Sequence, residues 1–297
     1  MWAHLALIAV AVFYGVNYFT IKLTFAEGFN SFEVLAVRSA IACSVFFLFH
    51  RLTIKEKVQS GRDYLLLAIC GLFGVSTNQT FFLWGISLTS PVNASVLMIT
   101  VPAFVFLLAW ISRNERMTLQ KLAGLLVAGG GALGLVLSQA DGNADSPGNW
   151  VGDLFIVLNA CSYASYLVLV RPLILRYNAF TIVKWIFIFG SLPNILLGSF
   201  FLEPSHWQNI GPEALFGVVF LILAATLGAY FLNAWAMKTL PSSAVGIYIY
   251  VQPVFVALIS AFLAKGGLGL VKIQFILLIF AGVFLVTARK QFLSFRR

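Results

Sequence analysis

The sequence predicts an all-α integral membrane protein with ten transmembrane helices, arranged as two inverted five-helix repeats. Three observations support this fold. The 297 residues are 61% hydrophobic and 10% charged, whereas soluble domains carry about 25% charged residues. Apolar runs of about 20 residues, enough to cross a bilayer, recur along the chain, and the two halves match one another in order. A soluble globular protein is excluded, because so much apolar surface must be covered by lipid.

Apolar runs bounded by Pro, Gly or charged residues divide the chain into the ten predicted spans. They cover residues 3–25, 31–50, 62–87, 91–112, 118–138, 150–171, 179–201, 213–238, 242–264 and 270–289. Several starts carry a capping or first-turn residue, namely Ser90-Pro91, Thr118, Asn149, Gly211-Pro212 and Ser242. The first span lacks a basic leading segment and contains polar residues, so we expect it to be retained and not cleaved as a signal peptide.

Lysine and arginine are divided unequally between the two predicted sides of the membrane. Of 19 such residues, 15 lie on the side that holds both termini, Lys22, Lys265 and Lys272 lie on the other, and Arg38 falls inside a helix. Cytoplasmic loops carry the excess of basic residues, so both termini are predicted to be cytoplasmic, in a bacterial inner membrane. The same distribution accounts for the formal charge of +9 without a nucleic-acid partner.

The chain repeats its own order at a shift of about half its length. The matched pairs are Trp84 with Trp235 and Pro102 with Pro253, at a shift of 151 residues, and Tyr14 with Tyr163, at 149. We place the repeats at residues 1–140 and 141–297, with a polar linker at 139–149. Five crossings per half make the second repeat inverted, which is typical of transporters with a site near the midplane.

The chain resembles the drug/metabolite transporter superfamily, specifically its ten-helix EamA-type members. The residues that carry the resemblance are Tyr14-Gly15, Asn17, Arg38, Trp84-Gly85, Asn93-Ala94, Pro102, Glu115, the glycine run Gly124–Gly134, Pro253 and Gly282. The resemblance spans nearly the whole chain and implies a transporter of small metabolites, with amino-acid export as the leading activity. The sequence departs from the family at Lys265-Gly266, where an acidic residue like Glu115 is usually repeated.

Polar side chains recur at helical spacing inside several spans, where they should face the bundle interior or an aqueous cavity. The candidate substrate-binding residues are Tyr14, Asn17, Tyr18, Arg38, Asn78, Gln79, Trp84, Met98, Asn159, Tyr163, Tyr166, Tyr230, Asn233, Tyr248 and Gln252. We expect them to line a central path between the first, third, fourth, sixth, eighth and ninth spans. Such a lining suits a small solute with an ammonium group or an apolar side chain. Interhelical hydrogen bonding explains any single one of them equally well.

Three charged residues near or inside the spans need separate interpretations. Arg38 requires a partner, because a central arginine costs about 2.5–3.5 kcal/mol on insertion scales. It either binds a substrate carboxylate or clamps backbone carbonyls and a tyrosine hydroxyl, and we favour the clamp. Lys22 is expected to extend to the membrane surface, and Glu33 to form a capping box with Asn30.

No span carries an acidic residue at its centre. Proton-driven export usually uses such a residue, so we predict facilitated diffusion or exchange. Pro102 and Pro253 are predicted in the middle of their helices, where each would remove a backbone hydrogen bond and act as a hinge or a static bend. Gly130 to Gly134 is predicted to form a GxxxG packing face.

The remaining patterns indicate no catalytic, metal or cofactor site. Gly129, Gly131 and Gly134 spell GxGxxG inside an apolar helix without the preceding strand of a dinucleotide site. The three histidines are far apart, and no nucleophile–base pattern is present, so an enzyme is not expected. The expected partners are a small solute and the lipid bilayer. The alternatives are transport of sugar phosphates, nucleotide sugars or drug-like cations, and a structural or sensory membrane protein; the sequence leaves substrate, direction, coupling ion and oligomeric state open.

Overall fold

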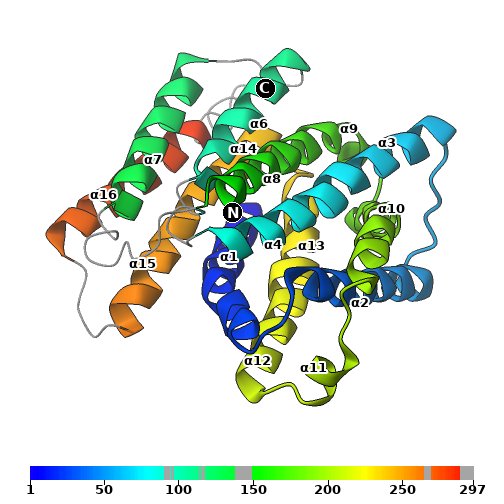
Figure 1. Ribbon diagram of the computed structural model, residues 1–297. Coiled ribbons are helices and arrows are strands. Elements are labelled where there is room, and N and C mark those ends of the chain that lie inside the picture. Colours follow the sequence, from blue (N-terminus) through cyan, green and yellow to red (C-terminus); the bar gives the residue numbers. More distant parts are fainter. Residues whose placement is uncertain are drawn as a thin grey trace.

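The computed structural model describes residues 1–89, 94, 97–113, 115, 118–137, 149–263 and 269–287, and its ordered elements are helices (Figure 1). Eight helical stretches are long and apolar enough to cross a membrane, and Thr100–Ile111 and Leu119–Leu135 are shorter apolar helices. The predicted all-α membrane fold is confirmed. The start of the predicted fourth span and most of the predicted linker lie outside the described residues.

The third span of each half contains a π-helical segment. In the first half, the elements are α1 (Trp2–Ala26), α2 (Ser31–Thr53), α3 (Gly61–Gly71), the π-helix η1 (Leu72–Thr77), α4 (Asn78–Leu88), α6 (Thr100–Ile111) and α7 (Leu119–Leu137). In the second half, they are α8 (Trp150–Leu169), α9 (Arg171–Arg176), α10 (Ala179–Ser199), α11 (Pro204–Gln208), α12 (Pro212–Ile222), the π-helix η2 (Leu223–Gly228), α13 (Ala229–Ala236), α14 (Ser242–Ile247), the 3-10 helix η3 (Tyr248–Val251), α15 (Gln252–Leu263) and α16 (Leu270–Thr287).

Polar caps set the starts of several helices. The Asn30 side chain accepts a hydrogen bond from the backbone of the first turn of α2, and the Glu33 carboxylate accepts one from the Asn30 N–H at 2.7 Å. The predicted capping box is therefore confirmed. Asn149 and Asn178 cap α8 and α10 in the same way, each accepting from the backbone N–H two residues on.

Helices of one half pack mainly against helices of the other half. α2 lies against α10, α7 against α16, α1 against α12 and α13, and α8 against α4 and α6. Figure 1 shows α7 and α16 side by side at one edge of the bundle. The interior of the protein is consequently the interface between the two halves.

Small residues allow the close contact between α7 and α16. A Cβ atom on Gly282 would lie 2.4 Å from the Ala128 backbone nitrogen, and one on Gly134 would lie 2.3 Å from the Phe275 ring. Gly131 faces α16 as well, whereas nothing lies within 4 Å of a Cβ placed on Gly130. The prediction that Gly130 belongs to the packing face is therefore wrong, because that residue points away from the partner helix.

The two prolines stand at helix starts and not in helix interiors. Pro102 is in the first turn of α6, which follows a turn at Ile99, and Pro253 is in the first turn of α15, which follows η3. A first-turn residue has no N–H partner within its own helix, so proline costs little there. The expected loss of an interior hydrogen bond is thus wrong, but both spans are interrupted at matching places.

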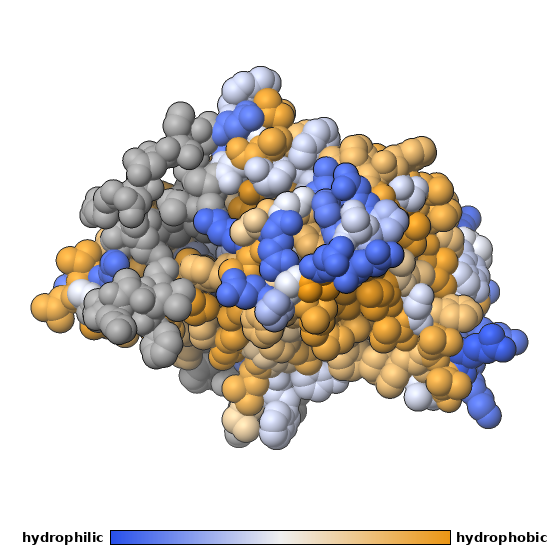
Figure 2. Space-filling model, turned by 60° about the horizontal axis from the view of Figure 1, so that its bottom comes forward, coloured by the Kyte–Doolittle hydropathy of each residue, from blue (hydrophilic) through white to orange (hydrophobic). Residues whose placement is uncertain are grey.

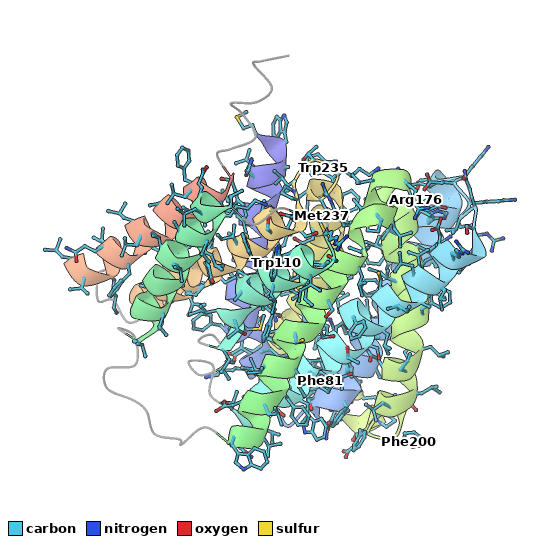
Figure 3. The ribbon with its side chains drawn as sticks, turned by 90° about the horizontal axis from the view of Figure 1, so that it is seen from above. Phe81, Trp110, Arg176, Phe200, Trp235 and Met237 are labelled. Atoms are coloured by element: carbon cyan, nitrogen blue, oxygen red, sulfur yellow. The ribbon has the colours of Figure 1, made fainter. Side chains whose placement is uncertain are left out.

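The outer surface carries large exposed apolar side chains, among them Leu48, Leu196, Phe216 and Leu277. On the face in Figure 2, hydrophobic residues cover broad areas and hydrophilic residues gather in separate patches. Arg176 lies at one end of the helices with Trp235, and Phe200 lies at the opposite end (Figure 3). This surface is the one expected for helices surrounded by lipid.

Candidate functional site

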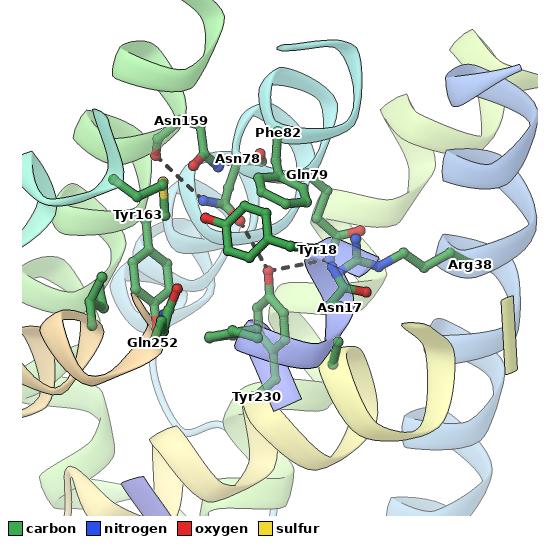
Figure 4. Close-up of a pocket in the computed structure, with 14 residues that line it drawn as sticks. Asn17, Tyr18, Arg38, Asn78, Gln79, Phe82, Asn159, Tyr163, Tyr230 and Gln252 are labelled. Atoms are coloured by element: carbon green, nitrogen blue, oxygen red, sulfur yellow. Dashed lines mark hydrogen bonds between the residues drawn. The ribbon is translucent and has the colours of Figure 1, made fainter. Parts of the chain in front are cut away.

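A cavity lies between the two halves (Figure 4). Its lining residues are Tyr14, Asn17, Tyr18, Arg38, Asn78, Gln79, Phe82 and Met98 from the first half, and Asn159, Tyr163, Ala225, Tyr230, Ile249 and Gln252 from the second. Eleven of the fifteen predicted site residues are among them. Phe82, Ala225 and Ile249 were not predicted, because an apolar residue in an apolar span has no distinguishing sequence signal.

Two further predicted residues line a smaller cavity that adjoins the first. Asn233 and Tyr248 lie there beside Leu7 and Val10, towards the amino-terminal end of α1, and the two cavities share Tyr14, Tyr163, Ile249 and Gln252. The Tyr248 hydroxyl lies 2.6 Å from His4 Nδ1. The polar path therefore continues from the central cavity towards this end of the bundle.

Trp84 and Tyr166 lie outside both cavities. Trp84 is 36% exposed and stacks on Phe155, with ring centroids 4.1 Å apart. It is five residues after Gln79, which places it about 140° away around an α-helix, so the two cannot share a face. Tyr166 does continue the predicted face of α8, but its ring packs against Gly74 in the core beyond the cavity.

Two amide side chains of the lining donate their N–H groups to other residues of the protein. Asn159 Nδ2 donates to the Asn78 carbonyl at 2.7 Å, and Gln79 Nε2 donates to the Tyr230 hydroxyl at 3.3 Å. The side-chain oxygens of Asn17, Gln79 and Asn159 are buried without a hydrogen-bond partner among the described residues. The protein leaves these three acceptors unused, and each oxygen is covered by its neighbours instead of being open to the cavity.

Arg38 is the only charged side chain among the described lining residues. It is 6% exposed, and its Nε donates to the Thr226 hydroxyl at 2.7 Å, which in turn donates to the Leu221 carbonyl at 2.7 Å. Arg38 is therefore a clamp, but among the described residues it holds a threonine hydroxyl of η2, and the expected partners, backbone carbonyls and a tyrosine hydroxyl, are wrong. Within the described residues, neither terminal guanidinium nitrogen bonds a protein acceptor, so these N–H groups are available to a bound molecule.

The two π-helical segments occupy equivalent places in the repeats. η1 and η2 are separated by 151 residues, the shift that also relates Trp84 to Trp235. Each is held by a cavity residue of the other half: the Tyr230 hydroxyl donates to the Gly74 carbonyl of η1 at 2.5 Å, and Arg38 holds η2. Sequence reasoning missed these segments, because no local propensity distinguishes a π-helix.

A polar cluster outside the spans joins the halves at the start of α14. Glu115 accepts hydrogen bonds from the Ser243 backbone N–H at 3.0 Å and from Lys121 Nζ at 2.6 Å. Burial would raise the pKa of the Glu115 carboxyl, but the hydrogen bonds from Lys121 and Ser243 outweigh it and hold the pKa below its usual value. Glu33 also lies away from the cavity, fully buried against His206 at 3.1 Å.

The profile of the EamA-like transporter family matches residues 1–137 and again residues 150–288. An uncharacterized transporter from Archaeoglobus fulgidus is 26% identical, with 78% of this chain and 79% of that protein covered. Protein WALLS ARE THIN 1 from Arabidopsis thaliana is 24% identical, with 97% and 83% covered. A crystal structure of another protein, 19% identical, matches the fold with a TM-score of 0.74 over 97% of this chain and 98% of that chain.

Proposed function

This chain belongs to the EamA-like transporter family, and we propose on that premise that it carries small metabolites by exposing its central cavity alternately to the two sides of the membrane. The observation that carries the proposal is the cavity itself, which residues of both repeats line and which contains the Arg38 guanidinium among tyrosine and amide side chains. A site at the interface of two inverted repeats can be opened to either side by moving one half against the other. The repeats at 1–140 and 141–297 are the bodies that move.

The cargo proposed is an amino acid or a related compound, contacted by the eleven lining residues and by Asn233 and Tyr248. Arg38 can hold a carboxylate through the terminal N–H groups of its guanidinium, which no acceptor among the described residues occupies. A drug-like cation is less well matched, because none of the described lining residues is acidic. A sugar phosphate would have Arg38 alone to neutralise a larger negative charge.

The transport mode proposed is export or exchange without a coupled proton. The described lining residues include no carboxylate that could carry a proton through the membrane. Pro102 and Pro253 border the interruptions at Ile99 and η3, and we assign them as hinges between the segments of their spans. With both termini in the cytoplasm, the cavity that contains Tyr248 leads to the cytoplasmic side.

The test is counterflow in proteoliposomes that are loaded with unlabelled amino acids one at a time, with and without a pH gradient. Saturable uptake of the labelled compound is expected, and a pH gradient alone should not drive it. Tyr163→Ala and Asn78→Ala should abolish exchange in protein that still elutes as a single species. Trp84→Ala is the matched control, because its side chain lies outside the cavity. Absence of exchange with every amino acid would refute this cargo and redirect the search to phosphorylated metabolites, nucleosides and cations.

A further inference from the structure

A threonine hydroxyl in each π-helical segment bonds back to the chain in the π-helical register. The Thr77 hydroxyl donates to the Leu72 carbonyl at 3.0 Å, and the Thr226 hydroxyl donates to the Leu221 carbonyl at 2.7 Å. Each carbonyl stands five residues before its threonine, which is the hydrogen-bond spacing of a π-helix. In an α-helix such hydroxyls reach three or four residues back, and Thr287 in α16 bonds four residues back. The two threonines therefore support the π-helical form of their segments.

Side chains of the opposite half hold both hydroxyls in place. Arg38 Nε of α2 donates to the Thr226 hydroxyl at 2.7 Å. The Ser162 hydroxyl of α8 shares a hydrogen bond with the Thr77 hydroxyl and also donates to a backbone carbonyl of η1 at 2.7 Å. The two threonines are not equivalent in the repeats, because the shift of 151 residues pairs Thr226 with Val75. The repeat alone therefore does not explain why both segments are held in this way.

The π-helical segments determine which face of the following helix meets the cavity. Each residue of an α-helix advances the rotation by about 100°, and a π-helical turn holds one residue more, because its hydrogen bonds reach five residues instead of four. Gln79 and Phe82 follow η1, Tyr230 follows η2, and all three line the cavity. If η1 became α-helical, Phe81 would take the direction that Phe82 has now. Phe81 at present stacks on Phe155, with ring centroids 5.7 Å apart.

We propose that Thr77 and Thr226 are positioning residues of the transport site. Each hydroxyl, fixed from the opposite half, holds its π-helical segment and so keeps the cavity residues after it turned towards the solute. Thr226 has a second effect: because the guanidinium is planar, the bond at Nε also fixes the direction of the terminal nitrogens of Arg38. The proposal rests on the proposed function and adds two residues that are not among the described lining residues of the central cavity.

The first experiment locates the face of α4 by the reactivity of introduced cysteines. Phe82→Cys and Phe81→Cys are made in the wild-type and Thr77→Val backgrounds and treated with 2-hydroxyethyl methanethiosulfonate. Peptide mass spectrometry locates the label, so the three native cysteines stay in place. Loss of one hydrogen bond raises the population of the turned helix about 3- to 10-fold. The ratio of the reaction rate at position 82 to that at position 81 should fall by this factor in Thr77→Val, and Thr77→Ser, which keeps a hydroxyl, should restore it.

The same measurement applies to η2. Asn233→Cys, at a position that lines the smaller cavity, is compared with Leu232→Cys in Thr226→Val and Thr226→Ser. Thr287→Val is the matched control, because it removes a hydroxyl that bonds in the α-helical register, and it should leave both ratios unchanged. Thr77→Ala and Thr226→Ala replace the valine variants if these do not fold.

The second experiment connects the positioning to transport. In counterflow of labelled L-alanine, Thr226→Val should raise the apparent KM about 10-fold, and Thr226→Ser should restore it. A hydroxyl that only stabilises the fold would lower the maximal rate and leave KM unchanged. Thr287→Val should change neither quantity.

Three results would count against these proposals in different ways. Unchanged cysteine ratios in Thr77→Val and Thr226→Val, or a fall that the serine variants do not reverse, would refute the positioning role. Altered ratios with a normal KM in Thr226→Val would refute its connection to the transport site. The ratios do not depend on any cargo, so they decide the positioning role even if the wild-type protein exchanges no L-alanine, a result that would contradict the proposed cargo alone.

Discussion

Replacing Tyr230 or Tyr166 by phenylalanine removes one hydroxyl from each of two neighbouring, buried rings, and the structure predicts opposite consequences. The rings are 3% and 1% exposed, with centroids 6.3 Å apart. The Tyr230 hydroxyl donates to the Gly74 carbonyl and accepts from Gln79. The Tyr166 hydroxyl has no hydrogen-bond partner among the described residues.

The expected magnitudes follow from these contacts. Leaving a buried partner without its hydrogen bond costs about 1–3 kcal/mol, while interhelical hydrogen bonds in membranes average about 0.6 kcal/mol with a maximum near 1.7. We therefore expect Tyr230→Phe to lower the free energy of unfolding by about 1–2 kcal/mol. Tyr166→Phe should be neutral or slightly stabilising, because it removes a polar atom that pays a desolvation cost without compensation.

The assay is unfolding of the purified protein in mixed micelles, titrated with a denaturing detergent and followed by tryptophan fluorescence. Wild type and both variants are compared in the same lipid and detergent mixture, which cancels the dependence on the environment. Equal loss of stability in the two variants, or a larger loss for Tyr166→Phe, would refute the assignment of hydrogen bonds around η1. Counterflow should decrease as well in Tyr230→Phe, since that ring lines the cavity.

Two further predictions concern packing and pH. Gly282→Leu should lower the free energy of unfolding by about 1–3 kcal/mol, because its side chain would meet the backbone of α7. Gly130→Leu, whose side chain meets open space, should leave that free energy nearly unchanged. Thermal unfolding of the two variants and the wild type checks the difference. Glu115→Gln should lower the free energy of unfolding by about 1–3 kcal/mol near neutral pH, because it weakens the contacts with Lys121 and Ser243. Since the pKa of Glu115 is lowered on folding, this contribution is complete above the ordinary glutamate value of about 4.3 and is lost as pH falls through the folded value. A difference between wild type and variant that persists unchanged at the lowest pH would contradict that reasoning.

The exchange measurements depend on these stability controls. A variant that stops counterflow is informative about the cavity only when its unfolding curve stays close to that of the wild type. Asn78→Ala needs the control most, because its amide oxygen and backbone carbonyl face Tyr230 and Asn159. Tyr163→Ala needs it for the same reason, since its hydroxyl accepts a hydrogen bond from Asn233 at 2.9 Å.

Helical spacing predicted much of the cavity from the sequence. A polar residue inside a membrane helix must face away from lipid, so the face with Asn159 and Tyr163 could be read directly, as could that with Tyr14 and Tyr18. The same rule failed for Trp84, since a large aromatic residue is stable against lipid and carries no demand for a polar partner. Helical spacing also does not show how far along the bundle a residue lies. For this reason Tyr166 was predicted to line the cavity, whereas it lies in the core.

The sequence by itself determined the membrane environment, the number of spans and the internal repeat, because these follow from composition, segment length and order along the chain. The tertiary structure decided which side chains meet. Only packing between the halves brings Arg38 to Thr226 and Tyr230 to Gly74. The two π-helical segments, and the breaks that put Pro102 and Pro253 at helix starts, also appear only in the structure. Such contacts join residues more than 150 positions apart, and no local propensity or periodicity contains that information.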